Sequence, residues 1–287
     1  MRRARTLWLC LLPLLLFAAG AVRASATGER DVAVVSFDPM SERLSATHKC
    51  TLDVVYDGTQ VSAGLRGYHL EITFDDTYVY VDSLYVHVTE GSFLSDVGGT
   101  AFFVEAVDES TFVVDCVMLG ATAGATGVGG LCSITFTGRT GDGISVVEFS
   151  EVELRDTDNR WIQVSVEFAV LTLDNTLPDS QAGPVAPYYN TASFDVPFTA
   201  SDAATGVQYV ELYYQLDGGG YVQYGSTFTV SPIAFAAPGE GVYEFYTIGT
   251  DNVGNVEDAP PAADCTTELD LTPPSSPVDL VALPGHN

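Results

Sequence analysis

Short runs of alternating apolar and polar residues, separated by turn residues, constrain the fold of this chain more than any other feature. Alternation with a period of two places successive side chains on opposite faces of a β-strand. After position 26 no long window carries the apolar spacing of a helix. We therefore predict an all-β protein built from β-sandwiches. The clearest early runs cover residues 51–56, 68–74, 78–88, 102–107, 111–119, 131–137, 145–154 and 163–173.

Two Pro-rich segments divide the runs. Residues 174–187 are rich in Pro, Asp, Gly and Asn, which is typical of a linker or a domain entrance. A second boundary is predicted at Pro273-Pro274-Ser275-Ser276-Pro277. We predict one β-sandwich over residues 27–174, a second over 175–272, and a linker or the truncated start of a third module over 273–287.

The first 26 residues have the pattern of a secretory signal peptide. Arg2, Arg3 and Arg5 precede an apolar stretch over residues 7–17, and Ala24-Ser25-Ala26 fits an A-x-A cleavage site. The apolar stretch is too short to span a bilayer. We expect a secreted or cell-surface protein with no membrane span after the signal peptide is removed.

The chain is strongly acidic. It has 11 Lys and Arg side chains against 38 Asp and Glu side chains, a formal net charge of −27. Removal of the signal peptide takes four arginines and no acid, which leaves Lys49 as the only lysine among seven basic residues. This balance argues against nucleic acid and anionic membranes as partners, since both are bound through Lys and Arg.

Four cysteines remain after the signal peptide, and their spacing fits no zinc motif. Cys116 and Cys132 each lie on the apolar side of an alternating run, on either side of the Gly-rich segment 120–130. If these runs form a hairpin, the two residues face each other and are predicted to form a disulfide, which export permits. The alternative is two buried free thiols. Cys50 and Cys265 fall in different predicted domains and are not paired.

Five segments between residues 32 and 174 carry a recognisable series of motifs. They are residues 64–76 (GLRGYHLEITFDD), 90–95 (EGSFLS), 100–103 (TAFF), 127–136 (GVGGLCSITF) and 152–162 (VELRDTDNRWI). Their glycines fall between predicted strands, where positive φ or close backbone approach is needed. In this order the segments resemble a cohesin domain, although Asp76 stands where the family usually has Pro.

The resemblance implies a nine-stranded jelly-roll sandwich that binds a calcium-loaded dockerin helix pair through one sheet. The predicted hairpin of residues 111–137 offers such a face, because apolar residues alternate outward along it. The alternative is that a loop or the neighbouring module covers this face. The predicted partner-binding residues are Val113, Asp115, Val117, Leu119, Leu131, Ser133, Thr135 and Thr137.

Residues 193–257 are similar to a bacterial Ig-like domain, and residues 272–280 resemble the entry of a fibronectin type III repeat. Exposed tyrosines on the run 207–216 and the following turn could stack on sugar rings, although exposed aromatics are also ordinary in sandwiches. The candidate glycan-stacking residues are Tyr209, Tyr213, Tyr221 and Trp161.

No arrangement of residues predicts catalysis. The histidines lie in no nucleophile-elbow or HExxH setting, and the carboxylate pairs fall at turns or on outward strand positions. We predict that the protein is not an enzyme and has no cofactor or metal. The alternative is calcium at one of two oxygen-rich turns, 155–159 or 251–258, although Asx turns explain both without a metal.

These features together predict a non-catalytic extracellular binding or scaffold module of cohesin type. The implied process is assembly of polysaccharide-degrading systems through a dockerin-like partner. The first alternative is polysaccharide binding, since the cohesin superfamily includes carbohydrate-binding modules. The second is a structural spacer of a cell-surface or adhesin-like protein.

Overall fold

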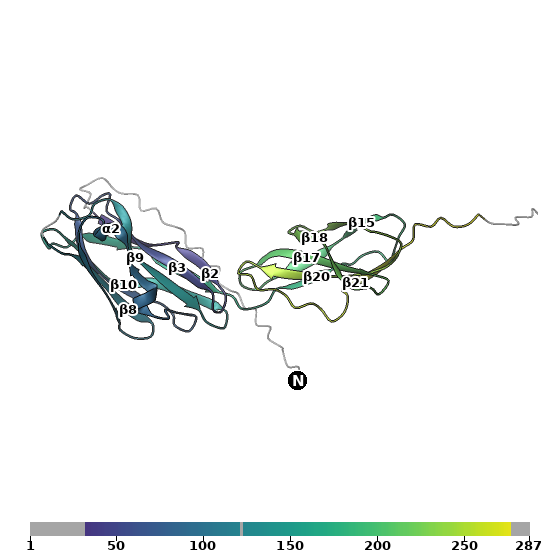
Figure 1. Ribbon diagram of the computed structural model, residues 1–287, viewed down its shortest axis with the longest axis horizontal. Coiled ribbons are helices and arrows are strands. Elements are labelled where there is room, and N and C mark those ends of the chain that lie inside the picture. Colours follow the sequence, from purple (N-terminus) through teal and green to yellow (C-terminus); the bar gives the residue numbers. More distant parts are fainter. Residues whose placement is uncertain (1–31, 121–122, 277–287) are drawn as a thin grey trace, which may run out of the picture. The chain divides into compact units, whose positions relative to one another are not determined.

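The computed structural model describes residues 32–120 and 123–276, and within them strands dominate (Figure 1). The helices of this part are two single turns, α1 (Leu84–His87) and α2 (Ser92–Ser95). No helix among the described residues is long and apolar enough to cross a membrane. The predicted all-β class is confirmed. The predicted signal peptide and residues 277–287 lie outside the described residues.

The strands between residues 32 and 173 form two facing six-stranded sheets. The β9 sheet contains, in spatial order, β11 (Gln163–Val166), β1 (Val32–Asp38), β3 (Lys49–Asp57), β9 (Val128–Gly138) and β5 (Val79–Tyr80), and β6 (Val88–Glu90) also pairs with β9. The β4 sheet contains β2 (Ser41–Leu44), β12 (Ala169–Leu173), β10 (Gly143–Asp156), β4 (Leu65–Thr73), β8 (Thr111–Met118) and β7 (Thr100–Ala106).

These twelve segments make up nine strands, because three strands are each divided in two, in agreement with the predicted nine-stranded sandwich. The chain passes from the β9 sheet to the β4 sheet between β1 and β2, where Pro39 interrupts the ladder, and it does so again between β11 and β12. The third divided run is β5 and β6, which flank α1 and both pair with β9. The first and last runs pair in parallel in each sheet, β1 with β11 and β2 with β12, and so close the sandwich.

Alternation within each strand fills the core between the two sheets. In β4 the side chains of Tyr68, Leu70 and Ile72 are at most 4% exposed, whereas His69, Glu71 and Thr73 between and after them are partly exposed. Aromatic rings add packing, because Phe37 of β1 stacks on Phe149 of β10 with ring centroids 4.4 Å apart. Burial of these apolar side chains is the main stabilising contribution to the sandwich.

The strands between residues 179 and 269 form a second β-sandwich with its own core. Its core is aromatic, and the rings of Phe235 and Phe245 meet edge to face at 4.9 Å. One sheet has the order β14 (Tyr188–Tyr189), β21 (Cys265–Leu269), β20 (Gly241–Asp251), β17 (Val207–Leu216) and β18 (Val222–Phe228). Two shorter ladders pair β13 (Asp179–Ala182) with β16 (Phe198–Ser201) and β15 (Ser193–Val196) with β19 (Ile233–Ala236).

The predicted hairpin between the runs 111–119 and 131–137 is wrong. β8 pairs with β4 and β7, whereas β9 pairs with β3 in the opposite sheet. A period of two determines which side chains share a face of one strand, but it does not determine which strand lies beside it. The chain between β8 and β9 therefore crosses from one sheet to the other.

The predicted disulfide between Cys116 and Cys132 is absent, and all four cysteines of the described chain are free. Cys116 points into the core from the β4 sheet and is 3% exposed, while Cys132 lies in the β9 sheet and is 1% exposed. Residues on two sheets cannot adopt the cross-strand geometry that the hairpin required. The structure matches the alternative of two buried free thiols.

We predict that all four thiols react slowly in the folded protein, since burial raises the pKa of Cys50 to about 12 and that of Cys265 to about 11. Burial raises the pKa of Cys116 to about 12 and also raises that of Cys132, so little reactive thiolate is present near pH 8. The chain from residue 27, purified without reductant, should release little thionitrobenzoate from an aromatic disulfide reagent until it is unfolded in guanidinium chloride. Unfolding should then expose four thiols, and a count of two would contradict the structure.

Candidate functional site

The outer surface of the β4 sheet is an ordered array of side chains contributed by β10, β4, β8 and β7. The register places outward residues of the four strands opposite one another in rows across the sheet. We call this surface the row face. The arginine row is Arg155, Gly67, Val117 and Ala101, the histidine row is Glu153, His69, Asp115 and Phe103, and the glutamate row is Glu151, Glu71, Val113 and Glu105.

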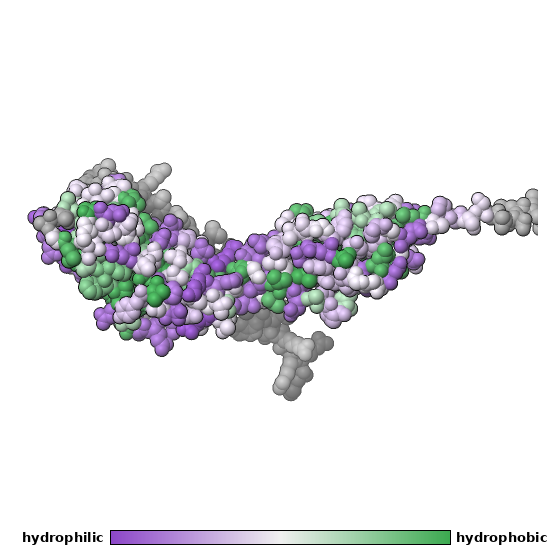
Figure 2. Space-filling view, viewed as in Figure 1, coloured by the Kyte–Doolittle hydropathy of each residue, from purple (hydrophilic) through white to green (hydrophobic). Residues whose placement is uncertain are grey.

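The row face exposes large apolar side chains beside charged ones. Phe103 is 63% exposed and Val117 is 45% exposed, although each lies within a regular strand. In Figure 2 hydrophobic atoms gather over the part of the first sandwich where Figure 1 labels β8 and β10. An apolar surface with a polar rim is typical of an interaction site.

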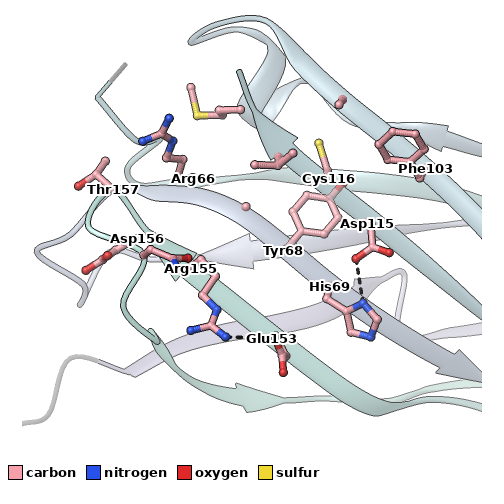
Figure 3. Close-up of a pocket in the computed structure, with 15 residues that line it drawn as sticks. Arg66, Tyr68, His69, Phe103, Asp115, Cys116, Glu153, Arg155, Asp156 and Thr157 are labelled. Atoms are coloured by element: carbon pink, nitrogen blue, oxygen red, sulfur yellow. Dashed lines mark hydrogen bonds and ion pairs between the residues drawn. The ribbon is translucent and has the colours of Figure 1, made fainter. Parts of the chain in front are cut away.

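A hollow of about 460 Å³ lies over the arginine and histidine rows (Figure 3). Gly67 forms its floor, because the glycine has no side chain between Arg155 and Val117. A Cβ atom at this position would lie 3.1 Å from the carbonyl oxygen of Cys116, so the close approach of β4 to β8 favours glycine here. Ala101, at the other end of the arginine row, has only a methyl side chain and so leaves the hollow open.

Charged groups around the hollow are held in fixed positions. His69 Nδ1 lies 2.8 Å from Asp115 Oδ1 in the same row (Figure 3). The guanidinium group of Arg155 lies 3.3 Å from the centre of the Trp161 ring and 3.5 Å from Glu153. Exposed pairs of this kind contribute little to stability, so their main effect is to orient the side chains.

The two ends of the row face differ in charge. The glutamate row presents three carboxylates, and Glu71 accepts a hydrogen bond of 2.6 Å from Ser150 Oγ. The opposite end carries Arg155 together with Arg66, which lines the hollow. A partner that covers this surface therefore meets an acidic edge, a middle row in which Phe103 projects beside Asp115 and His69, and a far edge where Arg155 lies in one row with Val117 and Ala101.

Three of the predicted partner-binding residues, Val113, Asp115 and Val117, point outward on the row face. Leu119 follows the end of β8 and is 55% exposed. Sequence reasoning missed the cross-strand neighbours of these residues, above all Phe103 and the Arg155 guanidinium. Alternation in the run 102–107 indicates that Phe103 and Phe102 point to opposite sides, but only the register shows that Phe103 lies beside Asp115.

The prediction that residues of β9 share this face is wrong, because β9 belongs to the opposite sheet. Leu131 and Thr137 are buried, at 1% and 3% exposure. Ser133 donates a hydrogen bond of 2.5 Å to Asp53 and the hydroxyls of Thr135 and Thr51 lie 2.9 Å apart, which ties both residues to β3.

The candidate glycan-stacking residues do not form one platform. In the second sandwich the rings of Tyr213 and Tyr221 pack around Tyr246, at centroid distances of 5.0 and 4.5 Å. Tyr209 lies further along β17, opposite Thr250 of β20. Trp161 belongs to the first sandwich, where it covers Arg155.

The two loops considered for calcium differ. Asp156 Oδ1 accepts hydrogen bonds of 2.8 Å from the N–H groups of Asp158 and Arg160, which is an Asx-type turn that needs no metal. In the other loop, a carboxylate oxygen of Asp251 lies within 4.8 Å of carboxylate oxygens of Asp174 and Asp202.

No family model and no curated protein sequence matches the chain. Similar solved structures include a type I cohesin–dockerin complex from Clostridium thermocellum, at 14% identity over 53% of this chain and 99% of that chain, with a TM-score of 0.42. A non-cellulosomal cohesin from Archaeoglobus fulgidus is 14% identical over 50% of this chain and 92% of that chain, with a TM-score of 0.39. The C-terminal domain of the Streptococcus pyogenes antigen I/II-family protein AspA is 8% identical over 84% of this chain and 98% of that chain, with a TM-score of 0.28.

Tyr68 connects the central strand of the row face to the opposite sheet, and its loss should destabilise the protein. Its hydroxyl donates a hydrogen bond of 2.7 Å to the carbonyl oxygen of Leu131 in β9, and burial raises the pKa of Tyr68, which keeps the donor protonated. We expect Tyr68→Phe to lower the free energy of unfolding in urea by about 1–2 kcal/mol, because a buried carbonyl loses its donor. The matched variant Tyr85→Phe, at a side chain that is 87% exposed, should change it by less than about 0.5 kcal/mol. Equal effects of the two variants would contradict this role.

Proposed function

We propose that the first sandwich is a non-catalytic recognition module that binds a partner protein through the row face, as a cohesin binds a dockerin. The observation that carries this proposal is the face itself, an open sheet surface on which Phe103 and Val117 are exposed between rows of charged side chains. Aromatic side chains that project from a rigid sheet are the kind of anchor on which interface affinity depends. The motif resemblance to cohesins suggests the class of partner.

The row face also suggests the chemistry of the partner surface. The hollow over Gly67, with Phe103, Val117 and Ala101 in its lining, would accept an apolar side chain from a partner helix. The acidic side chains of the glutamate row, together with Asp115, favour a partner whose contact surface carries Lys or Arg around that apolar group. Arg155, held between Trp161 and Glu153, is positioned to bind a carboxylate or a backbone carbonyl at the other edge.

Polysaccharide binding is the second candidate, and the cluster of Tyr213, Tyr221 and Tyr246 is the observation that supports it. The ring of Tyr213 already stacks on Tyr246, and the hydroxyls of Tyr213 and Tyr221 already contact Glu211 and Glu244. These groups satisfy one another within the second sandwich. Protein recognition through the row face is therefore the better supported function.

The predicted signal peptide and the acidic composition support a location for this module at the cell surface or in the extracellular medium. Its role there would be to collect enzymes that carry a partner module, which suits the breakdown of polysaccharides. The second sandwich would then hold the recognition module away from its neighbours.

The proposal is tested by measuring binding of the chain from residue 27 to dockerin-type modules encoded in the same genome, with calcium present. We expect one such module to bind, and we expect Phe103→Asp to weaken that binding at least about tenfold, because it removes an exposed aromatic anchor and adds a charge to an acidic surface. Titration calorimetry measures both affinities.

The matched control is Phe168→Asp. Phe168 lies between β11 and β12, outside the four strands of the row face, and is 57% exposed against 63% for Phe103. This variant should bind as tightly as the unchanged chain. Equal losses in the two variants would refute the row face as the binding surface, and glycan binding that Tyr213→Ala abolishes would favour the second candidate.

A further inference from the structure

Three carboxylates from separate parts of the chain meet at one end of the second sandwich. Asp174 follows β12, Asp202 follows β16, and Asp251 is the last residue of β20. One oxygen of each lies within 4.8 Å of the other two. Asp174 and Asp251 are fully buried, at 0% exposure, whereas Asp202 is partly exposed. The cluster therefore places two carboxylates that water does not screen beside a third at the surface.

No basic side chain of the described residues forms an ion pair with this cluster. Among the described residues the basic partners in ion pairs are His69, Arg155 and Arg160, and all three belong to the first sandwich. Buried charges in proteins are normally paired or bound to a metal ion, because an uncompensated charge in a low dielectric is costly.

The loops hold two of the carboxylates in place through hydrogen bonds. Asp174 Oδ2 accepts bonds from the N–H and the hydroxyl of Thr205, at 2.9 and 2.5 Å. Asp251 Oδ1 accepts bonds from the N–H groups of Val253 and Asn255, at 2.9 and 2.8 Å. Each carboxylate oxygen has more than one lone pair, so these bonds orient the groups and leave them able to bind an ion.

The hydrogen bonding of Asp202 indicates a missing partner, independently of the charge of the cluster. Its Oδ2 atom accepts three hydrogen bonds, from the N–H groups of Ala204, Thr205 and Gly206 at 3.1, 2.9 and 2.7 Å. Its Oδ1 atom is buried and has no hydrogen-bond partner among the described residues. A buried acceptor without a donor is rare in native proteins and indicates that something else satisfies it.

We propose that Asp174, Asp202 and Asp251 bind a calcium ion, with Asp202 Oδ1 as one of its ligands. The donor set consists of oxygen atoms alone, which suits a hard cation rather than zinc. Calcium takes six to eight oxygen ligands at about 2.3–2.6 Å in flexible geometry, so carboxylates on three loops are suitable ligands, whereas magnesium demands a stricter octahedron. The ion would balance two of the three negative charges and satisfy the unpartnered oxygen.

The surrounding amides join the three ligand segments to each other. Asn255 Nδ2 donates to the carbonyl oxygens of Asp174 and Thr176, at 3.0 and 3.3 Å. Asn252 Nδ2 donates to the carbonyl oxygen of Thr205 at 2.8 Å. Because each ligand comes from a different segment, ion binding stabilises the attachment of residues 174–176 to the loops that follow β16 and β20.

The experiment compares the chain from residue 27, stripped of metal with EDTA, in the absence and presence of CaCl2. We expect calorimetry to show one calcium ion per chain, and 10 mM CaCl2 to raise the Tm of the second sandwich by roughly 5–15 °C, for an affinity in the range of about 10⁻⁴ to 10⁻³ M. In Asp202→Asn the amide oxygen can still accept the loop N–H groups, while its NH2 group takes the place of the unpartnered oxygen. This variant should lose the site but keep the fold.

The sign of the effect of Asp202→Asn makes the test specific. In EDTA this variant should melt at the same temperature as the unchanged chain or higher, because it removes one of three like charges. In CaCl2 the order should reverse, and the control Asp195→Asn, at an exposed position of β15, should respond to calcium as the unchanged chain does. No calcium binding, an equal calcium response in Asp202→Asn, or an equal response to MgCl2 would each overturn the proposal.

Discussion

The pairing of β4 with both β10 and β8 is the interaction on which the first sandwich depends. It places Tyr68 and Leu70 in the core and, by alternation, His69 and Glu71 on the outer surface. A shift of one residue would exchange these two sets and bury charge in the core. The same register brings Gly67 between Arg155 and Val117, so the hollow on the row face follows from the strand pairing that builds the core.

This dependence explains which parts of the fold the sequence predicts. Alternation correctly assigns Val113, Asp115 and Val117 to one side of β8 and Phe112 and Cys116 to the other. It carries no information on the neighbouring strand. Consecutive strands often pair, but after β8 the chain crosses to the other sheet. The predicted hairpin and disulfide both rested on that one assumption about neighbours, and both failed with it, whereas the strand positions and the all-β class did not depend on it.

The aspartate cluster shows a second limit of sequence reasoning. The loop after β20 was recognisable as a candidate calcium site because Asp251 and two asparagines lie close together in the sequence. Asp174 lay in a segment whose composition is that of a linker, and Asp202 lay in an ordinary turn. Their meeting depends on the ends of β12, β16 and β20 coming together, a tertiary contact that no local pattern encodes.

The carboxylates of this chain therefore have two different effects, one on partner choice and one on stability. Most carboxylates lie on outer faces and turns, where water and salt screen them over about 8–10 Å, so they affect partner choice more than stability. Asp174 and Asp251 are fully buried and Asp202 is partly exposed, with one oxygen of each within 4.8 Å of the others. At an effective dielectric constant near 20, two unit charges at about that separation repel by about 3 kcal/mol, which is a large fraction of the net stability of a typical domain, about 5–15 kcal/mol. Hydrogen bonds from loop N–H groups offset part of this repulsion, and in the proposed site a calcium ion would offset more of it. We therefore expect loss of calcium to weaken the second sandwich and to leave the acidic surface of the first unchanged.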